Sequence, residues 1–300
     1  MALAVSTIID LFKSARSGDR RSLSKLLTKI ESGESLVIHP ESGWTLGVTG
    51  PPGVGKSTLI GRIIEYWAAA GQAVAVLAVD PTSPVSGGAF LADRIRMGGA
   101  DSEDSVFVRS LASRNHPGGL MPCLDVMCQV LYACGWSRVI IETVGSGQSE
   151  IRIVAFVDTV LLVDGPDRGD IIQAEKAGIL ELADVIAINK ADLPNSSFAA
   201  DAVKGALELS DGEAAPVHLV SAIDGSGVKP LIIDLESSQP NSARVVLRNR
   251  ERLIASWDSV LLSHPEIESH MEKLCDGTIT VGEAIKSMGS TIDFGGDLTD

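Results

Sequence analysis

Basic residues are few in this 300-residue sequence. It contains 25 Lys and Arg against 39 Asp and Glu, so its formal net charge at pH 7 is −14. An acidic surface repels the phosphate backbone of nucleic acids, which argues against a nucleic-acid partner. A single nucleotide is not excluded, because a local nest of backbone N–H groups can bind phosphates within an acidic protein.

Long apolar runs are also missing. No stretch reaches the roughly 18 consecutive apolar residues of a membrane span, so we expect no membrane partner. Residues 1–21 lack a basic leader followed by an apolar run and a cleavage site, and we therefore expect a cytoplasmic protein. With 45% hydrophobic residues, the chain can still bury a substantial core.

The cysteines form no C-x-x-C pair. Three of the four, Cys123, Cys128 and Cys134, lie in one apolar stretch with helical spacing, and Cys275 is remote. Buried free thiols are the simpler interpretation. The alternative is that Cys123 and Cys128 bind a metal together with His116.

From Trp44 onward, short β-rich runs alternate with turns and helical patterns. Most runs are continuously apolar, which is typical of strands covered on both faces. This pattern predicts an α/β fold with a doubly wound, mostly parallel sheet. The expected strands are residues 44–49, 73–79, 106–110, 138–143, 158–163, 185–189 and 216–220. We predict three parts: an N-terminal helical extension (1–36), a central α/β domain that contains this sheet (37–238) and a C-terminal helical extension (239–300).

A phosphate-binding loop follows the first of these strands. Residues 50–57 match the pattern G-x-x-x-x-G-K-[ST] between a strand and a helix, as the motif requires. Its glycines let backbone N–H groups surround an anion at the positive end of the helix. An ordinary glycine-rich turn is the alternative. The predicted nucleotide ligands here are Gly50, Pro51, Pro52, Gly53, Val54, Gly55, Lys56, Ser57 and Thr58.

Within this loop, Lys56 is expected to neutralise the β- and γ-phosphates, and Thr58 to contact the α-phosphate. Mg²⁺ prefers oxygen ligands, and the Ser57 hydroxyl is a candidate. Asp80 and Glu142 each end an apolar strand, where they either bind the metal or merely cap the strand. Asp93 is a further candidate for binding the metal. The alternative interpretation is that Asp93 is an exposed carboxylate on a helix.

The nucleobase is predicted by a second motif. Asn189, Lys190 and Asp192 form N-K-x-D at the end of a strand. The Asp192 carboxylate can accept both N1–H and N2–H of guanine, whereas adenine would leave it unpaired, at a cost of about 1–3 kcal/mol. Asn189 is expected to tie this loop to the phosphate loop, and the Lys190 stem to cover the ring. After the next strand, Ser221 and Ala222 place a backbone N–H where guanine O6 can accept it.

The γ-phosphate sensor is predicted at Gly145, in the stretch that begins with Glu142. Small signalling GTPases carry a water-orienting Gln directly after this glycine, but Ser146 stands there instead. Gln148 lies three residues beyond Gly145 and needs rearrangement to take that role. We therefore expect slow intrinsic hydrolysis that a partner or a dimer completes.

Together these motifs resemble the MeaB/ArgK/MMAA family. The resemblance covers nearly the whole chain and is carried by residues 50–57, 79–97, 142–150, 169–184 and 189–192. The pattern ETVG-x-GQSE after VDP-[ST]-SP is not a general GTPase pattern, and this chain departs from the family's usual ETVGVGQSE only at Ser146. Its members are GTPases that serve adenosylcobalamin-dependent acyl-CoA mutases, chiefly methylmalonyl-CoA mutase.

The resemblance implies a GTP-fuelled chaperone that gates adenosylcobalamin delivery to a mutase and protects that enzyme. It assigns the phosphate and magnesium site to the residues already named. It also makes residues 165–176 a switch, with Asp170, Gln173 and Lys176 as candidate couplers or simply a solvated helix face. The C-terminal helices, including Trp257, would support a homodimer or else pack on the core.

Three other functions stay open at this point. A nickel-enzyme maturation GTPase of the hydrogenase or urease type would share the fold and base motif. Such a protein is expected to carry a His-rich tract or a C-x-x-C pair, and this sequence has neither. An amino-acid-transport kinase would need a phosphoacceptor pocket. A binding module without activity would not need the intact set Lys56, Ser57, Asp80 and Glu142. The sequence does not distinguish methylmalonyl-, isobutyryl- and ethylmalonyl-CoA mutases as clients.

Overall fold

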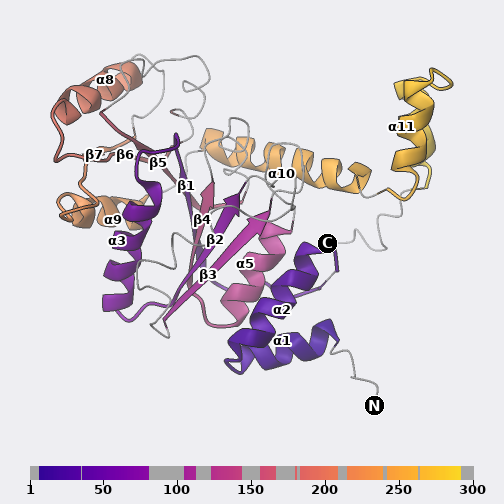
Figure 1. The fold of residues 1–300 in the computed structure, drawn as a ribbon, viewed down its shortest axis with the longest axis horizontal. Coiled ribbons are helices and arrows are strands. Elements are labelled where there is room, and N and C mark those ends of the chain that lie inside the picture. The colour runs from indigo at the N-terminus through magenta and orange to yellow at the C-terminus, as the bar shows by residue number, and fades with distance from the viewer. Residues whose placement is uncertain are drawn as a thin grey trace.

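A seven-stranded sheet forms the centre of the molecule (Figure 1). The computed structural model describes residues 7–34, 36–80, 105–112, 123–143, 156–166, 180, 183–208, 215–238, 242–262 and 264–291. The strands run in the order β3-β2-β4-β1-β5-β6-β7, and all six pairings between neighbours are parallel. Their bounds are β1 Trp44–Thr49, β2 Val74–Asp80, β3 Val106–Ala112, β4 Arg138–Thr143, β5 Thr159–Asp164, β6 Val185–Ile188 and β7 Val217–Leu219. The predicted fold class is confirmed.

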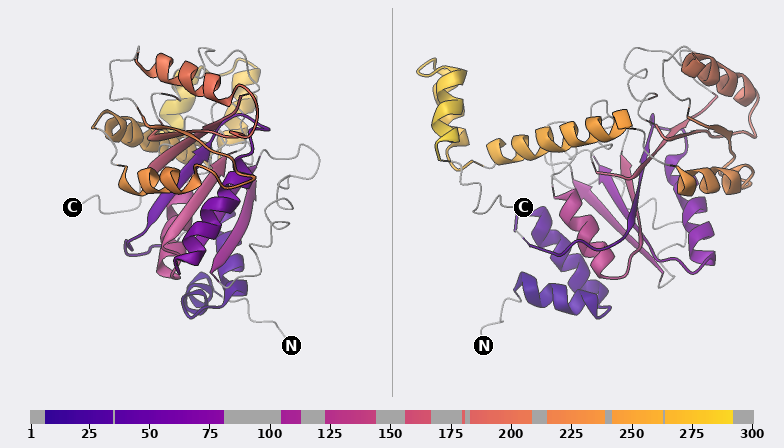
Figure 2. Two further views of the ribbon diagram at one scale, coloured as in Figure 1. Left: turned by 90° about the vertical axis from the view of Figure 1, so that its left-hand side faces the viewer. Right: turned by 180° about the vertical axis from the view of Figure 1, so that it is seen from behind.

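Helices cover both faces of this sheet, as Figure 2 shows from two further sides. The side chains of β2 alternate between two cores: Ala75 and Leu77 belong to one, and Val74 and Val76 to the other. This alternation explains why the strands are continuously apolar, since neither face meets water. The helices within and before the sheet region are α1 Ile8–Arg16, α2 Arg20–Glu31, α3 Lys56–Ala69, α5 Leu124–Ala133, α8 Ser196–Glu208 and α9 Val228–Ser237.

The first core lies beneath α1, α2 and α5, and the second beneath α3 and α9. Helix α3 follows β1 directly and crosses to the face opposite α5, which is the arrangement of a doubly wound sheet. A third cluster joins α8 to β5 and β6. The carboxyl ends of β1, β4, β6 and β7 therefore lie at one edge of the sheet. The predicted phosphate and base motifs lie at this edge.

The N-terminal helices are tied to the edge strand β3. Arg109 of β3 forms an ion pair of 2.6 Å with Glu31 of α2, and both side chains are largely buried. The same guanidinium donates to the carbonyl oxygen of Ser24 at 3.1 Å. Helix α1 begins with a capping box between Thr7 and Asp10, which satisfies two N–H groups of its first turn.

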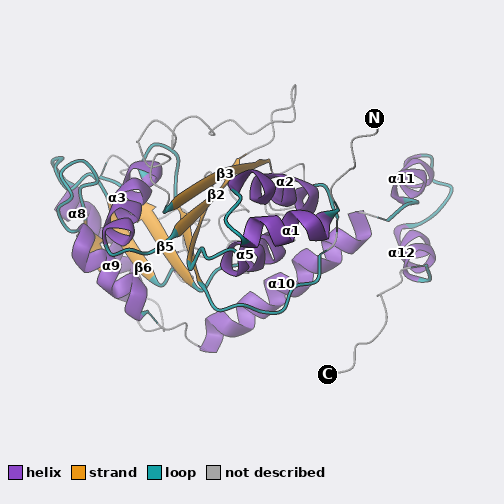
Figure 3. Cartoon of the chain, turned by 90° about the horizontal axis from the view of Figure 1, so that it is seen from below, coloured by secondary structure: helices purple, strands orange, loops and turns teal. Residues whose placement is uncertain are grey.

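Beyond α9, the described part of the chain contains three more helices: α10 Ser242–Leu262, α11 Ile267–Cys275 and α12 Val281–Gly289. They confirm the helical character predicted beyond residue 240. Figure 3 shows α10 running past the domain, with α11 and α12 at its far end. Arg252 of α10 lies 3.0 Å from Asp125 of α5. The division of the chain into three domains stays a prediction.

Along α10, two large apolar side chains are exposed to a considerable extent. Leu253 is 71% exposed and Trp257 is 47% exposed. Trp257 is thus half covered within the single chain, and both alternatives that the sequence left open, a dimer contact and packing on the core, stay predictions. Among the described residues, no helix is long and apolar enough to cross a membrane.

Candidate functional site

The glycine-rich loop of residues 50–55 connects β1 to α3 at the carboxyl edge of the sheet. Gly50 has φ +136°, and a Cβ atom there would lie 2.0 Å from the carbonyl oxygen of Val163 on β5. Gly55, with φ +90°, is the N-cap of α3. Both positions need glycine, because an L side chain is strained at positive φ and Gly50 has no room for one. The backbone of Gly50 thus packs directly against β5.

Lys56 begins α3 and points back into this loop. Its Nζ donates to the carbonyl oxygens of Gly50 at 2.6 Å and Pro51 at 3.0 Å, and the residue is only 7% exposed. The first N–H groups of α3 and its dipole add positive potential at the same place. The loop and the helix start therefore bring an ammonium group and helix N–H groups together, an arrangement suited to an anion. Within this loop Val54 is buried, whereas Thr58, one turn into α3, is exposed.

A buried carboxylate lies beside the loop. Glu142 of β4 is 3% exposed, and its Oε1 accepts a hydrogen bond of 2.8 Å from the Ser57 hydroxyl. The register of β1 against β4 pairs Val48 with Glu142, so the strand order itself brings Glu142 to the loop. One residue further, the hydroxyls of Thr49 and Thr143 lie 3.2 Å apart.

Oxygen donors of this kind are those that Mg²⁺ prefers. A hydroxyl at a helix start and a nearly buried carboxylate within 2.8 Å of it fit the ion, because each offers a hard oxygen on the anion-binding side. The backbone of Asp80 ends β2 at the same edge, next to β4, whose Thr143 pairs with Val79. The Asp80 side chain and the whole of Asp93 lie outside the described residues. In the described part of the chain, no three His, Cys, Asp or Glu residues are grouped to hold a metal.

Asn189 joins the phosphate loop to the base motif. Its Nδ2 donates to the carbonyl oxygen of Val54 at 2.8 Å, and its Oδ1 accepts the Ala222 N–H at 3.1 Å. A Cβ atom on Gly55 would lie 2.6 Å from the same Nδ2, so this glycine also makes room for the amide. The tie between the two loops that the sequence predicted is present, and Asn189 is buried within it.

The two loops that should hold the base also meet each other. Ser221 Oγ donates to Asp192 Oδ1 at 2.8 Å, and the Ala191 N–H donates to the Val220 carbonyl at 2.9 Å. Lys190 adopts φ +61°, which turns the chain sharply between Asn189 and Asp192. Both backbone N–H groups of the Ser221-Ala222 pair, one of which the sequence assigned to guanine O6, have partners here: Ala222 N–H donates to Asn189 and Ser221 N–H to the Ser226 carbonyl.

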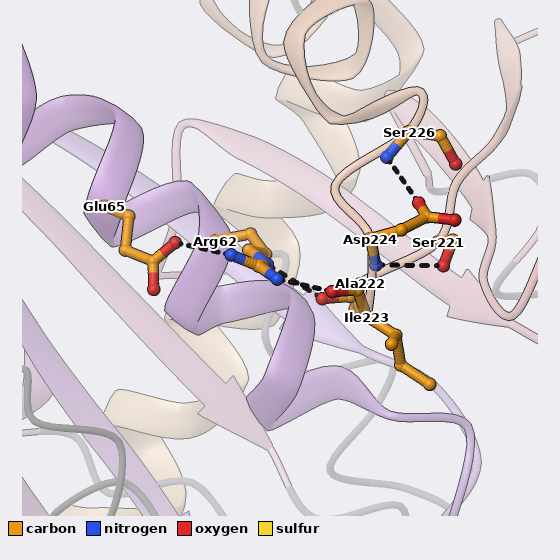
Figure 4. Close-up of polar contacts among 7 residues, drawn as sticks. All are labelled: Arg62, Glu65, Ser221, Ala222, Ile223, Asp224 and Ser226. Carbon is orange, nitrogen blue, oxygen red and sulfur yellow. Dashed lines mark hydrogen bonds and ion pairs between the residues drawn. The ribbon is translucent and has the colours of Figure 1, made fainter.

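One contact in this region was not predicted from the sequence. Arg62 of α3 donates from Nε to the Ala222 carbonyl at 2.9 Å and from Nη2 to the Ile223 carbonyl (Figure 4). No phosphate-loop or base motif includes this position. The only available hint was its place six residues after Lys56, on a helix that must pass beside the base loops.

Several predicted residues lie outside the described part of the chain. They are Gly145, Gln148 and Asp93 of the site, His116 of the alternative metal site, and the switch candidates Asp170, Gln173 and Lys176. The cysteine interpretation is confirmed at Cys128, a buried free thiol. Burial raises the pKa of the Cys128 thiol far above its usual range, so it is not a thiolate near neutral pH.

Comparisons with known proteins found a matching family model and several relatives. The family model described as methylmalonyl Co-A mutase-associated GTPase MeaB matches residues 6–260. A protein of Pyrococcus horikoshii named as a GTPase is 40% identical over 238 residues, which cover 75% of each chain. The fused isobutyryl-CoA mutase of Cupriavidus metallidurans is 37% identical over 188 residues, which are 59% of this chain and 17% of that protein.

Among solved structures, a LAO/AO transport system kinase superposes with a TM-score of 0.60. The match covers 97% of this chain and 99% of that one, at 21% sequence identity. At this identity the likeness concerns the fold alone.

Proposed function

The chain belongs to the MeaB family of methylmalonyl-CoA mutase-associated GTPases, and on this premise we propose that it is a GTP-driven chaperone of an adenosylcobalamin-dependent acyl-CoA mutase. GTP binding and hydrolysis follow from the family. The finer role is supported by one observation above others: a segment similar to this chain occurs within a protein named as a fused mutase. In the proposed cycle, the nucleotide state gates cofactor delivery and protects the mutase, with methylmalonyl-CoA mutase as first client.

We assign the phosphates to the loop of residues 50–55 and Lys56. Lys56 Nζ now donates to two loop carbonyls, and these contacts can be exchanged for β- and γ-phosphate oxygens. Ser57 and Glu142 would hold Mg²⁺, together with Asp80 and Asp93. When bound, the ion would offset the negative charge that develops on the phosphate oxygens during hydrolysis.

Guanine would be selected by Asp192. Ser221 donates to one carboxylate oxygen at 2.8 Å, which fixes the rotation of the group and leaves it oriented for the N1–H and N2–H donors of the base. Asn189 would keep the base loop at a fixed distance from the phosphate loop, and the Lys190 stem would cover the ring. Adenine lacks those donors and would leave the carboxylate with Ser221 as its hydrogen-bond donor, so GTP should bind more tightly than ATP.

Hydrolysis itself would depend on residues 145–148. Gly145 would sense the γ-phosphate, and Gln148 would orient the attacking water after a rearrangement. Slow intrinsic turnover is the consequence, because the residue directly after Gly145 is Ser146. Binding of a mutase or of a second copy of the chain would then induce the rearrangement that brings Gln148 to the attacking water.

A homodimer would form through the C-terminal helices. Large apolar side chains of α10 and α12 are exposed in the single chain: Val246, Leu253, Trp257, Leu262, Val281 and Ile285. Exposed apolar side chains of this number along projecting helices favour a protein contact. Sedimentation of wild type against Leu253→Lys tests this: a dimer that becomes a monomer supports the assignment, and a monomeric wild type contradicts it.

The decisive experiment measures steady-state GTP turnover of the purified protein, alone and with adenosylcobalamin-dependent methylmalonyl-CoA mutase from the same source. We expect slow turnover that rises several-fold with the mutase. ATP serves as the control for base selection, and Lys56→Ala as the control for contaminating GTPases. Turnover that the mutase leaves unchanged would exclude this client, and an equal rate with ATP would overturn the role of Asp192.

A further inference from the structure

The loop after β7 is closed by its own hydrogen bonds. We call residues 221–227 the Ser221 loop. The Gly225 N–H donates to the Ser221 carbonyl at 2.8 Å, and the Ser221 N–H donates to the Ser226 carbonyl at 3.0 Å. The carboxylate of Asp224 accepts the Ser226 N–H at 2.8 Å, and this bond lowers the pKa of Asp224. These hydrogen bonds make the Ser221 loop one compact structural unit.

Arg62 attaches this unit to α3. Its guanidinium donates to two consecutive carbonyls of the loop, those of Ala222 and Ile223. A third donor, Nη1, lies 3.0 Å from Glu65 one turn along the helix (Figure 4). A guanidinium carries several donors in one rigid plane, so it can hold two adjacent carbonyls at once.

Ala222 is hydrogen-bonded on both sides, to Arg62 of α3 and to Asn189 after β6. Its carbonyl accepts from Arg62, and its N–H donates to Asn189, which in turn donates to Val54. Only the Asn189 contact belongs to the recognised base motif. Arg62 supplies the second attachment, from the helix whose first residue is Lys56.

The second carbonyl leads to the base-reading carboxylate. In a planar trans peptide the C=O and the following N–H point in opposite directions. The Ile223 carbonyl accepts from Arg62, and on the other side of the same peptide the Asp224 N–H donates to Ser221 Oγ at 3.4 Å. Ser221 Oγ donates onward to Asp192 at 2.8 Å. An unbroken series of hydrogen bonds thus runs from α3 to Asp192, and bonds in such a series polarise one another.

We infer that Arg62 is a positioning residue for guanine recognition, which holds the Ser221 loop on α3 so that Ser221 orients the Asp192 carboxylate. The inference rests on the proposed role of Asp192 in reading guanine. Because α3 also carries Lys56 and Ser57, this contact fixes the base end of the site relative to the phosphate end. The Arg62 guanidinium donates to the Ala222 and Ile223 carbonyls and to Glu65, so Arg62 would act on the base through the loop.

Comparing the binding of GDP and inosine diphosphate distinguishes this positioning role from a general structural role. Inosine diphosphate lacks the 2-amino group that Asp192 would accept, so the ratio of the Kd for inosine diphosphate to the Kd for GDP measures that contact. We expect Arg62→Met to lower this ratio about 3- to 10-fold, the equivalent of one misaligned hydrogen bond. Arg62→Lys, which keeps the charge but has one donor group in place of the fork, is expected to lie between Met and wild type.

Glu65→Gln is the matched control. It removes the exposed partner of Arg62 and leaves both carbonyl contacts, so the ratio should stay within about twofold of wild type. In a Ser221→Ala background, Arg62→Met should lower the ratio no further, because the series of bonds is already broken. Thermal unfolding without nucleotide establishes that each variant is folded, and Arg62→Lys provides the test if Arg62→Met is not.

Three results would overturn the inference. Equal weakening of GDP and inosine diphosphate by Arg62→Met would reduce Arg62 to a structural contact. A full further loss in the Ser221→Ala background would show that Arg62 acts by another route. A wild-type protein that binds both nucleotides equally would overturn the role of Asp192 itself, and this failure is recognisable before any variant is made.

Discussion

Alanine at two glycines of the phosphate loop should have different effects, and the structure gives the reason. Gly50 and Gly53 both have positive φ, +136° and +81°. A methyl group on Gly53 meets nothing within 4 Å, whereas one on Gly50 would lie 2.0 Å from the Val163 carbonyl oxygen. Gly53→Ala therefore costs backbone strain alone, about 1–2 kcal/mol.

Gly50→Ala has the same kind of strain and a clash in addition. The methyl and the Val163 oxygen must separate from 2.0 Å to at least the 3.4 Å of ordinary contact. The loop cannot yield without disturbing the pairing of Thr49 with Leu162 between β1 and β5. Overpacking of this kind costs about 1–3 kcal/mol beyond the strain. At about 3 °C per kcal/mol for a chain of this size, Gly50→Ala should melt about 6 °C below Gly53→Ala.

Differential scanning calorimetry of both variants without nucleotide measures this difference. Nucleotide is left out because ligand binding raises the melting temperature by an amount that depends on affinity. Equal melting temperatures would refute the reasoning, since they would mean that the loop leaves β5 at no cost. A lower melting temperature for Gly53→Ala would contradict the geometry of the loop altogether.

Three further predictions follow from described contacts. Asn189→Ala should lower the free energy of unfolding by about 2–4 kcal/mol and weaken GDP binding, because a buried N–H and a buried carbonyl lose their partner; urea denaturation and calorimetry measure both. Arg109→Met should cost about 3–5 kcal/mol in the same assay, because it removes the guanidinium that offsets the largely buried Glu31, and recovery by the double variant with Glu31→Leu is the control. Iodoacetamide at pH 8 should modify the exposed Cys275 well before Cys134, because burial raises the pKa of the Cys134 thiol to about 11 and little thiolate is present. Mass spectrometry of the peptides measures the order of modification. This order should be lost in guanidinium chloride.

The sheet could be predicted closely from the sequence. The predicted strands 44–49 and 138–143 coincide with β1 and β4, and the other strand ends differ by two residues at most. The reason is physical: a strand buried on both faces must be apolar throughout, so the ends of the apolar run mark the ends of the strand. The phosphate and base motifs were equally visible, because they depend on glycine, lysine and asparagine at fixed spacing.

Contacts between distant elements were not visible in the same way. The helical pattern of α3 says which side faces the core, but it does not say which loop lies beside Arg62. The N–H of Ala222 has its partner only because Asn189 reaches across from another strand. Exposure along α10 was likewise undecided, since an apolar stripe predicts burial without saying whether its own chain or another one covers it.

The order of strands has a consequence for synthesis on the ribosome. β1 stands at the centre of the sheet, yet its partners are made much later: Trp44 pairs with Arg138, and Leu46 pairs with Thr159. Until β4 and β5 have left the exit tunnel, the nascent chain carries the apolar β1 with two unsatisfied edges, next to the segment that becomes the nucleotide loop. Parallel pairing over such separations is slow and prone to aggregation, so nascent-chain chaperones should engage this protein before residue 164 emerges. The strand that carries the phosphate loop is thus among the first to be synthesised and can acquire its structure only when more than half of the chain exists.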